Sequence, residues 1–204
     1  MRKKIGIMGG TFDPIHIGHL ILGEKAYEQF ELDQVWFMPA GRPPHKRNRN
    51  NSATDEQRVE MIQRAIKNND HFQLCLEDMS TDGYSYTYLL LARLCKKYPE
   101  YDFCFIIGAD SLFDFDGWKE PGKICQLAHI LVAGRNESGE NELNRQIMEL
   151  TDRYHGKFSI IQNPNLHIAS HMLREWVKCS QSIRYYVPDS VSDYIREQHI
   201  YQMK

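Results

Sequence analysis

Two histidines, His16 and His19, stand three residues apart shortly after a run of small residues that begins at Gly9. At the start of a helix this spacing places both imidazoles on one face, where they can donate hydrogen bonds to the same anion. Small residues let backbone N–H groups approach a phosphate chain, and the first turn of a helix adds partial positive charge. Gly18, between the two histidines, leaves room for a ligand against the backbone. The pattern therefore predicts a phosphate-binding site.

The same segment has blander interpretations. It lacks the Lys and Ser/Thr of a Walker loop and the spacing of GxGxxG, so neither common nucleotide fingerprint applies. A pair of histidines after a glycine-rich turn could also be an ordinary surface or core pair. Their position directly after an apolar run and a Gly-Gly-Thr-Phe turn favours a function.

Strand-like and helix-like segments alternate along the chain. Apolar runs of strand length lie at residues 5–8, 35–38, 72–76, 103–107, 130–133 and 158–161, with helical spacing between them at 20–30, 56–66, 88–98 and 143–154. This alternation predicts an α/β fold, a Rossmann-like doubly wound parallel sheet with helices on both faces. Pro188 is placed to open a final helix. We therefore expect a single domain over residues 1–204 with a small C-terminal helical part over about 165–204.

The residues directly after the predicted strands are the first candidates for a site, because ligands of open parallel sheets bind beyond the C-terminal ends of the strands. They are Gly9, Gly10, Thr11 and Phe12 after the first strand, His45 and Lys46 after the second, Gly108 and Asp110 after the fourth, and Arg135 after the fifth. The polar residues 47–54 predict a loop beside the second group. The acidic residues 137–142 are interpreted as a solvated loop.

The composition is that of an ordinary globular protein, with 204 residues of which 42% are hydrophobic and 25% charged. A formal net charge of −2 gives no long-range attraction for nucleic acid, so no nucleic-acid partner is expected. No apolar run has the length of a signal peptide core or a membrane span, so we expect no membrane association and a cytoplasmic location. The five cysteines form no CxxC pair, which predicts reduced core residues.

The run from Gly9 to His19 resembles the signature of the nucleotidylyltransferase superfamily, whose HxGH element is shared with class I aminoacyl-tRNA synthetases. Its full form, GGTFDPxHxGH, resembles that of the bacterial nicotinate-mononucleotide adenylyltransferases. The likeness extends over nearly the whole chain through Pro43-Pro44-His45-Lys46, Arg58 with Met61, Tyr84-Ser85-Tyr86-Thr87, Ile107-Gly108-Ala109-Asp110 with Trp118, and Ser182-Ile183-Arg184-Tyr185-Tyr186-Val187-Pro188. HxGH alone is moderately specific, whereas these blocks in this order are highly specific.

The resemblance implies transfer of the adenylyl group of ATP to nicotinate mononucleotide, with release of pyrophosphate. It implies catalytic roles for His16, His19 and Lys46, with ATP bound by Gly9, Gly10, Thr11, Phe12, Gly18, Gly108, Asp110, Ser170 and Arg174. The mononucleotide would be bound by Tyr86, Thr87, Trp118, Arg135 and His45, with Trp118 stacked on the pyridine ring and the backbone of Tyr86 and Thr87 facing its carboxylate. Mg²⁺ is implied by the triphosphate and is expected on its oxygens, since no carboxylate cluster is present to hold the ion.

Residues 168–174 depart from the family pattern. The family shows ISSTxIR there as a phosphate-binding helix start, whereas this chain has Ile-Ala-Ser-His-Met-Leu-Arg. We expect Ser170 to cap this helix and Arg174 to offer its guanidinium to paired phosphate oxygens. His167 and His171 lie four residues apart, but no third ligand follows at a suitable spacing, so no protein-held metal is expected.

Several alternatives remain open at this stage. Trp118 could be a core residue, and Asp110 could cap the helix that follows it. The chain could be another nucleotidylyltransferase, such as a pantetheine-phosphate adenylyltransferase or a cytidylyltransferase, but the Tyr86-Thr87 block and Trp118 argue against this. A non-catalytic nucleotide-binding module is disfavoured by the intact histidine pair and lysine. A homo-oligomer is compatible with the sequence.

Overall fold

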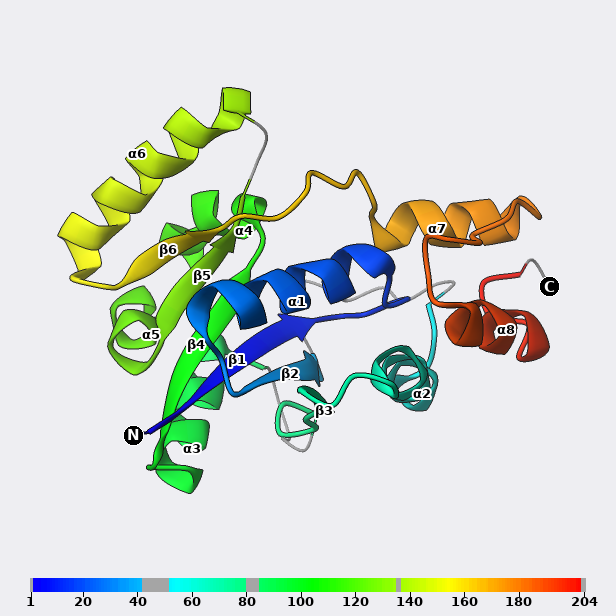
Figure 1. Ribbon diagram of the computed structural model, residues 1–204, viewed down its shortest axis with the longest axis horizontal. Coiled ribbons are helices and arrows are strands. Elements are labelled where there is room, and N and C mark those ends of the chain that lie inside the picture. Colours follow the sequence, from blue (N-terminus) through cyan, green and yellow to red (C-terminus); the bar gives the residue numbers. More distant parts are fainter. Residues whose placement is uncertain (1, 42–51, 80–84, 135–136, 203–204) are drawn as a thin grey trace.

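The computed structural model describes residues 2–41, 52–79, 85–134 and 137–202, and these residues form a parallel sheet of six strands (Figure 1). The strands are β1 (Lys3–Gly10), β2 (Gln34–Pro39), β3 (Phe72–Leu74), β4 (Tyr101–Ile107), β5 (His129–Ala133) and β6 (Phe158–Ile161). Their spatial order is β3-β2-β1-β4-β5-β6. The order reverses direction between β1 and β4, which is the position where open parallel sheets bind their ligands.

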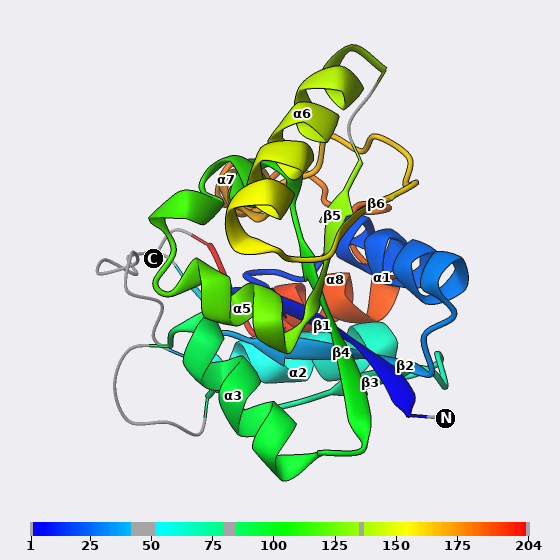
Figure 2. The ribbon, with the colours of Figure 1, turned by 90° about the vertical axis from the view of Figure 1, so that its left-hand side faces the viewer.

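Helices cover both faces of this sheet (Figures 1 and 2). One face packs against α1 (Ile17–Phe30), α2 (Asp55–Ile66), α7 (Ser170–Lys178) and α8 (Asp189–Glu197). The other face packs against α3 (Thr87–Lys97), α4 (Ala109–Phe113), the short 3-10 helix η1 (Phe115–Gly117), α5 (Pro121–Leu127) and α6 (Glu137–Tyr154). Alternate residues of β1 serve the two layers, since Ile5 and Ile7 pack toward α3 and Met8 packs toward α1. Burial on both faces explains why the strands read as continuous apolar runs.

The predicted doubly wound α/β fold is confirmed, and every predicted strand is present, though β1 and β4 begin two residues earlier than the apolar runs and β3 ends two residues sooner. The prediction of a loop at residues 137–142 is wrong, because α6 already begins at Glu137. Glutamate is a strong helix former and is favoured in the first turn of a helix, so the acidic stretch extends the helix instead of preceding it.

The C-terminal helices share the core of the sheet face they cover. Leu173 of α7 and Val191 and Ile195 of α8 belong to the same buried cluster as Met61 of α2. The predicted final helix is present as α8, which begins directly after Pro188, its N-cap residue. In the part of the chain that is described, no helix is both long and apolar enough to cross a membrane.

The cysteines are all free thiols, but they are not all core residues. Cys104 and Cys125 are buried and Cys75 and Cys95 are half-buried, whereas Cys179 is exposed. Cys179 lies at the C-cap of α7, beyond the last buried turn of that helix, so the prediction of a core position is wrong for this residue.

Candidate active site

The loops that follow β1, β2 and β4 meet at one edge of the sheet. Met8 pairs with Ile106 in the parallel ladder, so Gly10 is level with Gly108 two residues further along both strands. The backbone N–H of Ala40, after β2, donates to the carbonyl of Gly10 at 2.8 Å. The structure thus brings together three of the strand-end segments that the sequence singles out.

The two histidines form a stacked pair at the start of α1. Their ring centroids lie 3.7 Å apart with 26° between the ring planes. His16 is the N-cap residue of α1, and its backbone N–H donates to Nδ1 of His19 at 3.2 Å. Because Nδ1 of His19 accepts this bond, the proton of the neutral ring is on Nε2. The fold therefore selects the tautomer in which His19 presents an Nε2–H donor.

Both imidazoles are neutral near pH 7. Burial lowers the pKa of His16 from 6.5 to about 4. Burial, and then the neighbouring His16, holds the pKa of His19 well below its usual range. Within the described residues, Nδ1 of His16 is buried without a hydrogen-bond partner. The N-cap geometry directs the His16 side chain toward the backbone N–H of His19, so this nitrogen faces the first turn of α1.

Small residues shape the turn around this pair. A Cβ atom added at Gly18 would lie 3.1 Å from both Cε1 and Nδ1 of His16, so the glycine accommodates the neighbouring imidazole. A Cβ at Gly10 would lie 3.1 Å from the ring of Phe12. Phe12 adopts a positive φ of 50°, and its ring lies 5.0 Å from that of His19 in an edge-on arrangement. The glycines are thus needed for packing inside the turn, a reason that sequence inspection did not supply.

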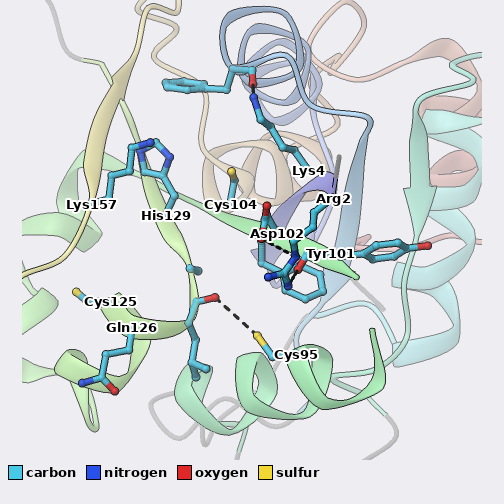
Figure 3. A pocket seen from close by; sticks show the side chains of 14 residues that line it. Arg2, Lys4, Cys95, Tyr101, Asp102, Cys104, Cys125, Gln126, His129 and Lys157 are labelled. Carbon is cyan, nitrogen blue, oxygen red and sulfur yellow. Dashed lines mark hydrogen bonds and ion pairs between the residues drawn. The ribbon is translucent and has the colours of Figure 1, made fainter. Parts of the chain in front are cut away.

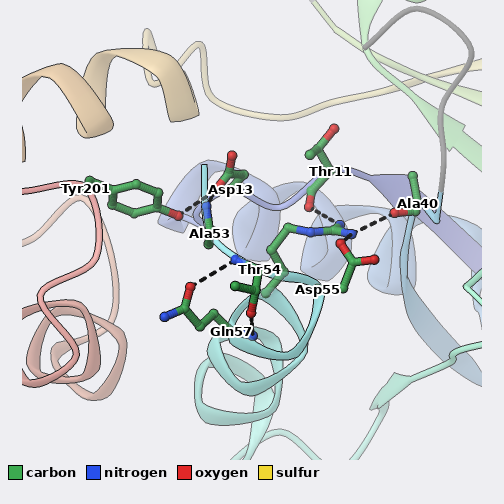
Figure 4. Close-up of polar contacts among 9 residues, drawn as sticks. Thr11, Asp13, Ala40, Ala53, Thr54, Asp55, Gln57 and Tyr201 are labelled. Atoms are coloured by element: carbon green, nitrogen blue, oxygen red, sulfur yellow. Dashed lines mark hydrogen bonds and ion pairs between the residues drawn. The ribbon is translucent and has the colours of Figure 1, made fainter. Parts of the chain in front are cut away.

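Asp13 ties this turn to three distant parts of the chain, and Figure 4 shows two of these contacts, with Tyr201 and Ala53. Its buried carboxylate Oδ1 accepts a hydrogen bond from the Tyr201 hydroxyl at 2.7 Å and another from the Ala53 backbone N–H at 3.0 Å. Nη1 of Arg174 donates to the Asp13 carbonyl at 2.6 Å and lies 3.7 Å from Oδ2. Ala53 directly precedes Thr54, the N-cap of α2. In the sequence Asp13 is part of the motif without an assigned role. The structure shows that its carboxylate and carbonyl anchor the turn.

Arg58 of α2 provides a second anchor for these loops. Its side chain is only 1% exposed, although it is charged and lies on α2. Nη1 donates to the carbonyl of Thr11 at 2.7 Å, and Nη2 donates to the carbonyl of Ala40 at 2.9 Å and to Oδ1 of Asp55 at 2.8 Å. A single guanidinium therefore joins the ends of β1 and β2.

The altered segment at residues 168–174 lies beside the same turn. Ser170 Oγ donates to the carbonyl of Pro14 at 2.9 Å, and the N-cap of α7 is Ala169, so the prediction that Ser170 caps the helix is wrong. Ser170 is the first residue of the helix, one position after the N-cap, and its hydroxyl bonds to the neighbouring loop instead of capping the helix. His171 is exposed, and His167 precedes α7, so the two do not share a helix face. The described residues contain no group of three His, Cys, Asp or Glu side chains suited to a metal ion.

Comparison with known proteins decides the family. The profile described as cytidylyltransferase-like matches residues 7–176. A protein of Lachnoclostridium phytofermentans named "Probable nicotinate-nucleotide adenylyltransferase" is 42% identical over 199 residues, covering 98% of this chain and 99% of its own. A protein of the same name from Bacillus cytotoxicus is 38% identical, with 98% and 99% covered. The chain belongs to the nicotinate-nucleotide adenylyltransferases, within the cytidylyltransferase-like family.

Solved structures of this family share the fold. A nicotinic acid mononucleotide adenylyltransferase of Plasmodium falciparum, complexed with APC, superposes with a TM-score of 0.76 at 22% identity, covering 98% of this chain and 97% of its own. The same enzyme complexed with NaAD gives a TM-score of 0.77. At this identity the likeness establishes the architecture, and residue roles rest on the geometry of this chain.

The residues that the adenylyltransferase family motif assigns to the mononucleotide come from two segments that meet in space. Thr87 begins α3 and Tyr86 is its N-cap. The backbone N–H groups of Thr87 and Tyr88 precede the first backbone bond of the helix, whereas that of Leu89 donates to the Tyr86 carbonyl at 3.0 Å. Nζ of Lys119 lies 4.7 Å from the ring centroid of Tyr86, which places the residue after Trp118 next to the start of α3. Trp118 is half-buried, with its ring 5.3 Å from that of Phe115. One part of the Trp118 ring thus packs in the core, and the other part is accessible to a ligand.

Gly108 and Asp110 lie at the start of α4. Gly108 is the N-cap, and a Cβ added there would meet no atom within 4 Å, so this strand end faces open space. Asp110 is the second residue of α4 and not its cap, which removes the alternative that it serves to cap this helix. His45, Lys46 and Arg135 lie outside the described residues.

Proposed function

We propose that this adenylyltransferase joins nicotinate mononucleotide to the AMP part of ATP, giving nicotinate adenine dinucleotide and pyrophosphate. The observation that carries the proposal is the stacked pair of His16 and His19 at the start of α1, with Nε2–H of His19 selected as a donor. Full-length relatives at 42% and 38% identity that carry the adenylyltransferase name support the same reaction.

The chemistry needs positioning more than an enzyme nucleophile. A 5′-phosphate oxygen of the acceptor attacks the α-phosphorus of ATP, and the bond from that phosphorus to the bridging oxygen breaks. The electron pair leaves with pyrophosphate. Charge grows on the phosphate oxygens during this step, and preorganised donors that meet it there lower the barrier. Nε2–H of His19 and the imidazole of His16 are proposed for this role. Both rings are neutral, so no charged group has to lose its water shell when the phosphate binds.

ATP is proposed to lie over the turn after β1 and the end of β4. The contacts assigned to it are those of the backbone of Gly9, Gly10, Thr11, Phe12 and Gly18, the strand end at Gly108 with Asp110 toward ribose, and the start of α7 with Ser170 and Arg174. The described contacts of Arg174 use Nη1. A guanidinium carries five donors, so several remain for a phosphate of ATP.

Nicotinate mononucleotide is proposed to lie between α3 and Trp118. The first-turn N–H groups of α3, next to Tyr86 and Thr87, would receive the ring carboxylate, since the start of a helix favours negative charge. Trp118 would offer its ring to the pyridine. His45 and Arg135 would complete this side, and Lys46 would act with the two histidines on the transferring phosphate.

Mg²⁺ is proposed as the companion of ATP. The donors around the turn are imidazoles and backbone N–H groups, which suit phosphate oxygens and not a hard cation. The ion would therefore bind through triphosphate oxygens, where it neutralises charge. A cytoplasmic location, a single domain over 1–204 and the absence of a nucleic-acid partner remain predictions from the sequence, with which a homo-oligomer is also compatible.

The test is a pyrophosphate-release assay with ATP and a panel of acceptors: nicotinate mononucleotide, nicotinamide mononucleotide and 4′-phosphopantetheine. We expect turnover with nicotinate mononucleotide to exceed that with 4′-phosphopantetheine by orders of magnitude. Trp118→Ala should raise the KM for the mononucleotide by about tenfold, as base–aromatic stacking is worth roughly 1–3 kcal/mol, and leave that for ATP nearly unchanged. Release with 4′-phosphopantetheine alone, or with no acceptor in the panel, would overturn the proposal.

A further inference from the structure

A cavity lies at the edge of the sheet opposite the candidate active site, where β1, β4 and β5 begin (Figure 3). This cavity has a volume of about 530 Å³, within the range of about 300–1,000 Å³ typical of small-molecule sites. Phe30 at the end of α1, Phe103 of β4 and Leu127 at the end of α5 give it an apolar lining. No part of the proposed reaction uses this edge.

The cavity is positively charged in a chain whose net charge is −2. Arg2, Lys4 and Lys157 line it, against the single carboxylate of Asp102. Arg2 is already engaged, since its Nε lies 3.1 Å from Oδ1 of Asp102 and its Nη2 donates to two backbone carbonyls. The two lysines are therefore the cations left to face a ligand.

These lysines are only weakly engaged by the protein. Nζ of Lys4 has one long contact, 3.4 Å to the carbonyl of Phe30. Lys157 is exposed, and its side chain has no hydrogen bond or ion pair with the residues that the structure describes. Two ammonium groups with spare donors at one cavity are suited to an anion that accepts several hydrogen bonds.

Lys4, Lys157 and His129 lie on the same face of the sheet, the face that α1 covers. Even-numbered residues of β1 face α1, and in β5 His129 has the same orientation as Leu131, which packs in the α1 layer. His129 is bonded through Nε2 to Oγ of Ser159 at 2.9 Å, and its ring meets that of Phe30 edge-on at 5.8 Å. Burial, followed by Lys157 and Lys4, lowers the pKa of His129 to about 4, so both ammonium groups act on this imidazole.

We propose that this cavity binds a phosphomonoester attached to a planar ring, of about mononucleotide size, with the phosphate between Lys4 and Lys157 and the ring against Phe30. The cations supply the charge and the apolar lining supplies a surface for the ring. The site is separate from the histidine pair, so it stands whether or not the proposed function holds.

The test is an NMR titration of the whole protein with phenyl phosphate, AMP and inorganic phosphate as probes. We expect phenyl phosphate and AMP to shift the backbone amides of Cys104 and His129, and inorganic phosphate to do so more weakly. Lys4→Ala and Lys157→Ala should each weaken phenyl phosphate binding at this edge about threefold to fivefold, and the double variant about tenfold, because each ammonium is exposed and screened. Lys157→Arg should retain binding, and Lys67→Ala, an exposed lysine at the end of α2, should change nothing.

Three outcomes would overturn the proposal. The first is shifts confined to Gly9 and Gly108, which would place the probe at the other edge only. The second is equal weakening by Lys67→Ala, which would indicate unspecific charge attraction. The third is a loss of thermal stability in Lys4→Ala without any loss of binding, which would mean that the cation serves only the carbonyl end of α1.

Discussion

Replacing Tyr201 by Phe removes one oxygen atom from the contacts that anchor the turn after β1 and leaves the ring in place. The Tyr201 hydroxyl donates at 2.7 Å to Oδ1 of Asp13, and both residues are 4% exposed. Burial, the negative charge of Asp13 and this hydrogen bond together hold the pKa of Tyr201 well above its usual range, so the hydroxyl stays protonated as a donor.

The expected loss follows from the remaining partners. Without the hydroxyl, Oδ1 of Asp13 keeps only the Ala53 backbone N–H among the contacts described above, and Arg174 stays 3.7 Å from Oδ2. A hydrogen bond to a charged group is worth about 1.5–3 kcal/mol. We therefore expect Tyr201→Phe to lower the free energy of unfolding by about 2 kcal/mol, measured by urea denaturation with an unchanged m-value.

A matched control exists in the same chain. The Tyr154 hydroxyl donates to Oδ1 of Asp116, also at 2.7 Å, but this pair is accessible to solvent. Tyr154→Phe should cost well under 1 kcal/mol, because water replaces the lost bond and screens the carboxylate. Equal losses in the two variants would refute the reasoning, since the buried position of Asp13 would then make no difference.

Three further predictions concern the histidines and Arg174. His19→Ala should lower kcat by about a hundred- to a thousandfold with a folded protein, because its Nε2–H is proposed to meet charge that grows in the transition state; near-normal kcat would exclude that role. Arg174→Lys should raise the KM for ATP about tenfold and leave that for the mononucleotide nearly unchanged, since an ammonium cannot reproduce the planar, paired donors of the guanidinium that also holds the Asp13 carbonyl. The pKa of His16 is depressed from 6.5 to about 4, so the unfolded chain binds more protons between these values and stability should fall as pH drops through this window, by at most about 3 kcal/mol. Urea titrations of wild type and His16→Gln at pH 7, 5.5 and 4 check this, and equal pH slopes in the two proteins would contradict it.

The fold could be predicted from the sequence because its signals are local. A strand buried on both faces appears in the sequence as a short apolar run. Gly9 and Gly10 mark the end of the first such run, β1. The two histidines could be found for the same reason, since they lie only three positions apart in the sequence. The helical structure of residues 137–142 could not be predicted, because acidic residues are common both in loops and at helix starts.

The anchors could not be predicted, because their partners are far apart in the chain. Asp13 meets Tyr201 across 188 positions, and no local pattern pairs the two residues. Arg58 did leave a signal, since Met61 and Ile62 follow it at helical spacing on the buried side of α2. A charged residue in the middle of an apolar stripe is a reason to look for a buried role, which here is holding two strand ends together.

The packing of Gly18 against His16 has a consequence for how this motif can evolve. Since a Cβ at position 18 would lie 3.1 Å from the His16 ring, a larger residue there requires that ring to shift by a few tenths of an ångström. Such a shift changes how the ring stacks on His19, so a substitution at Gly18 acts on the imidazole pair although the glycine has no side chain of its own. Selection on the pair therefore extends to position 18.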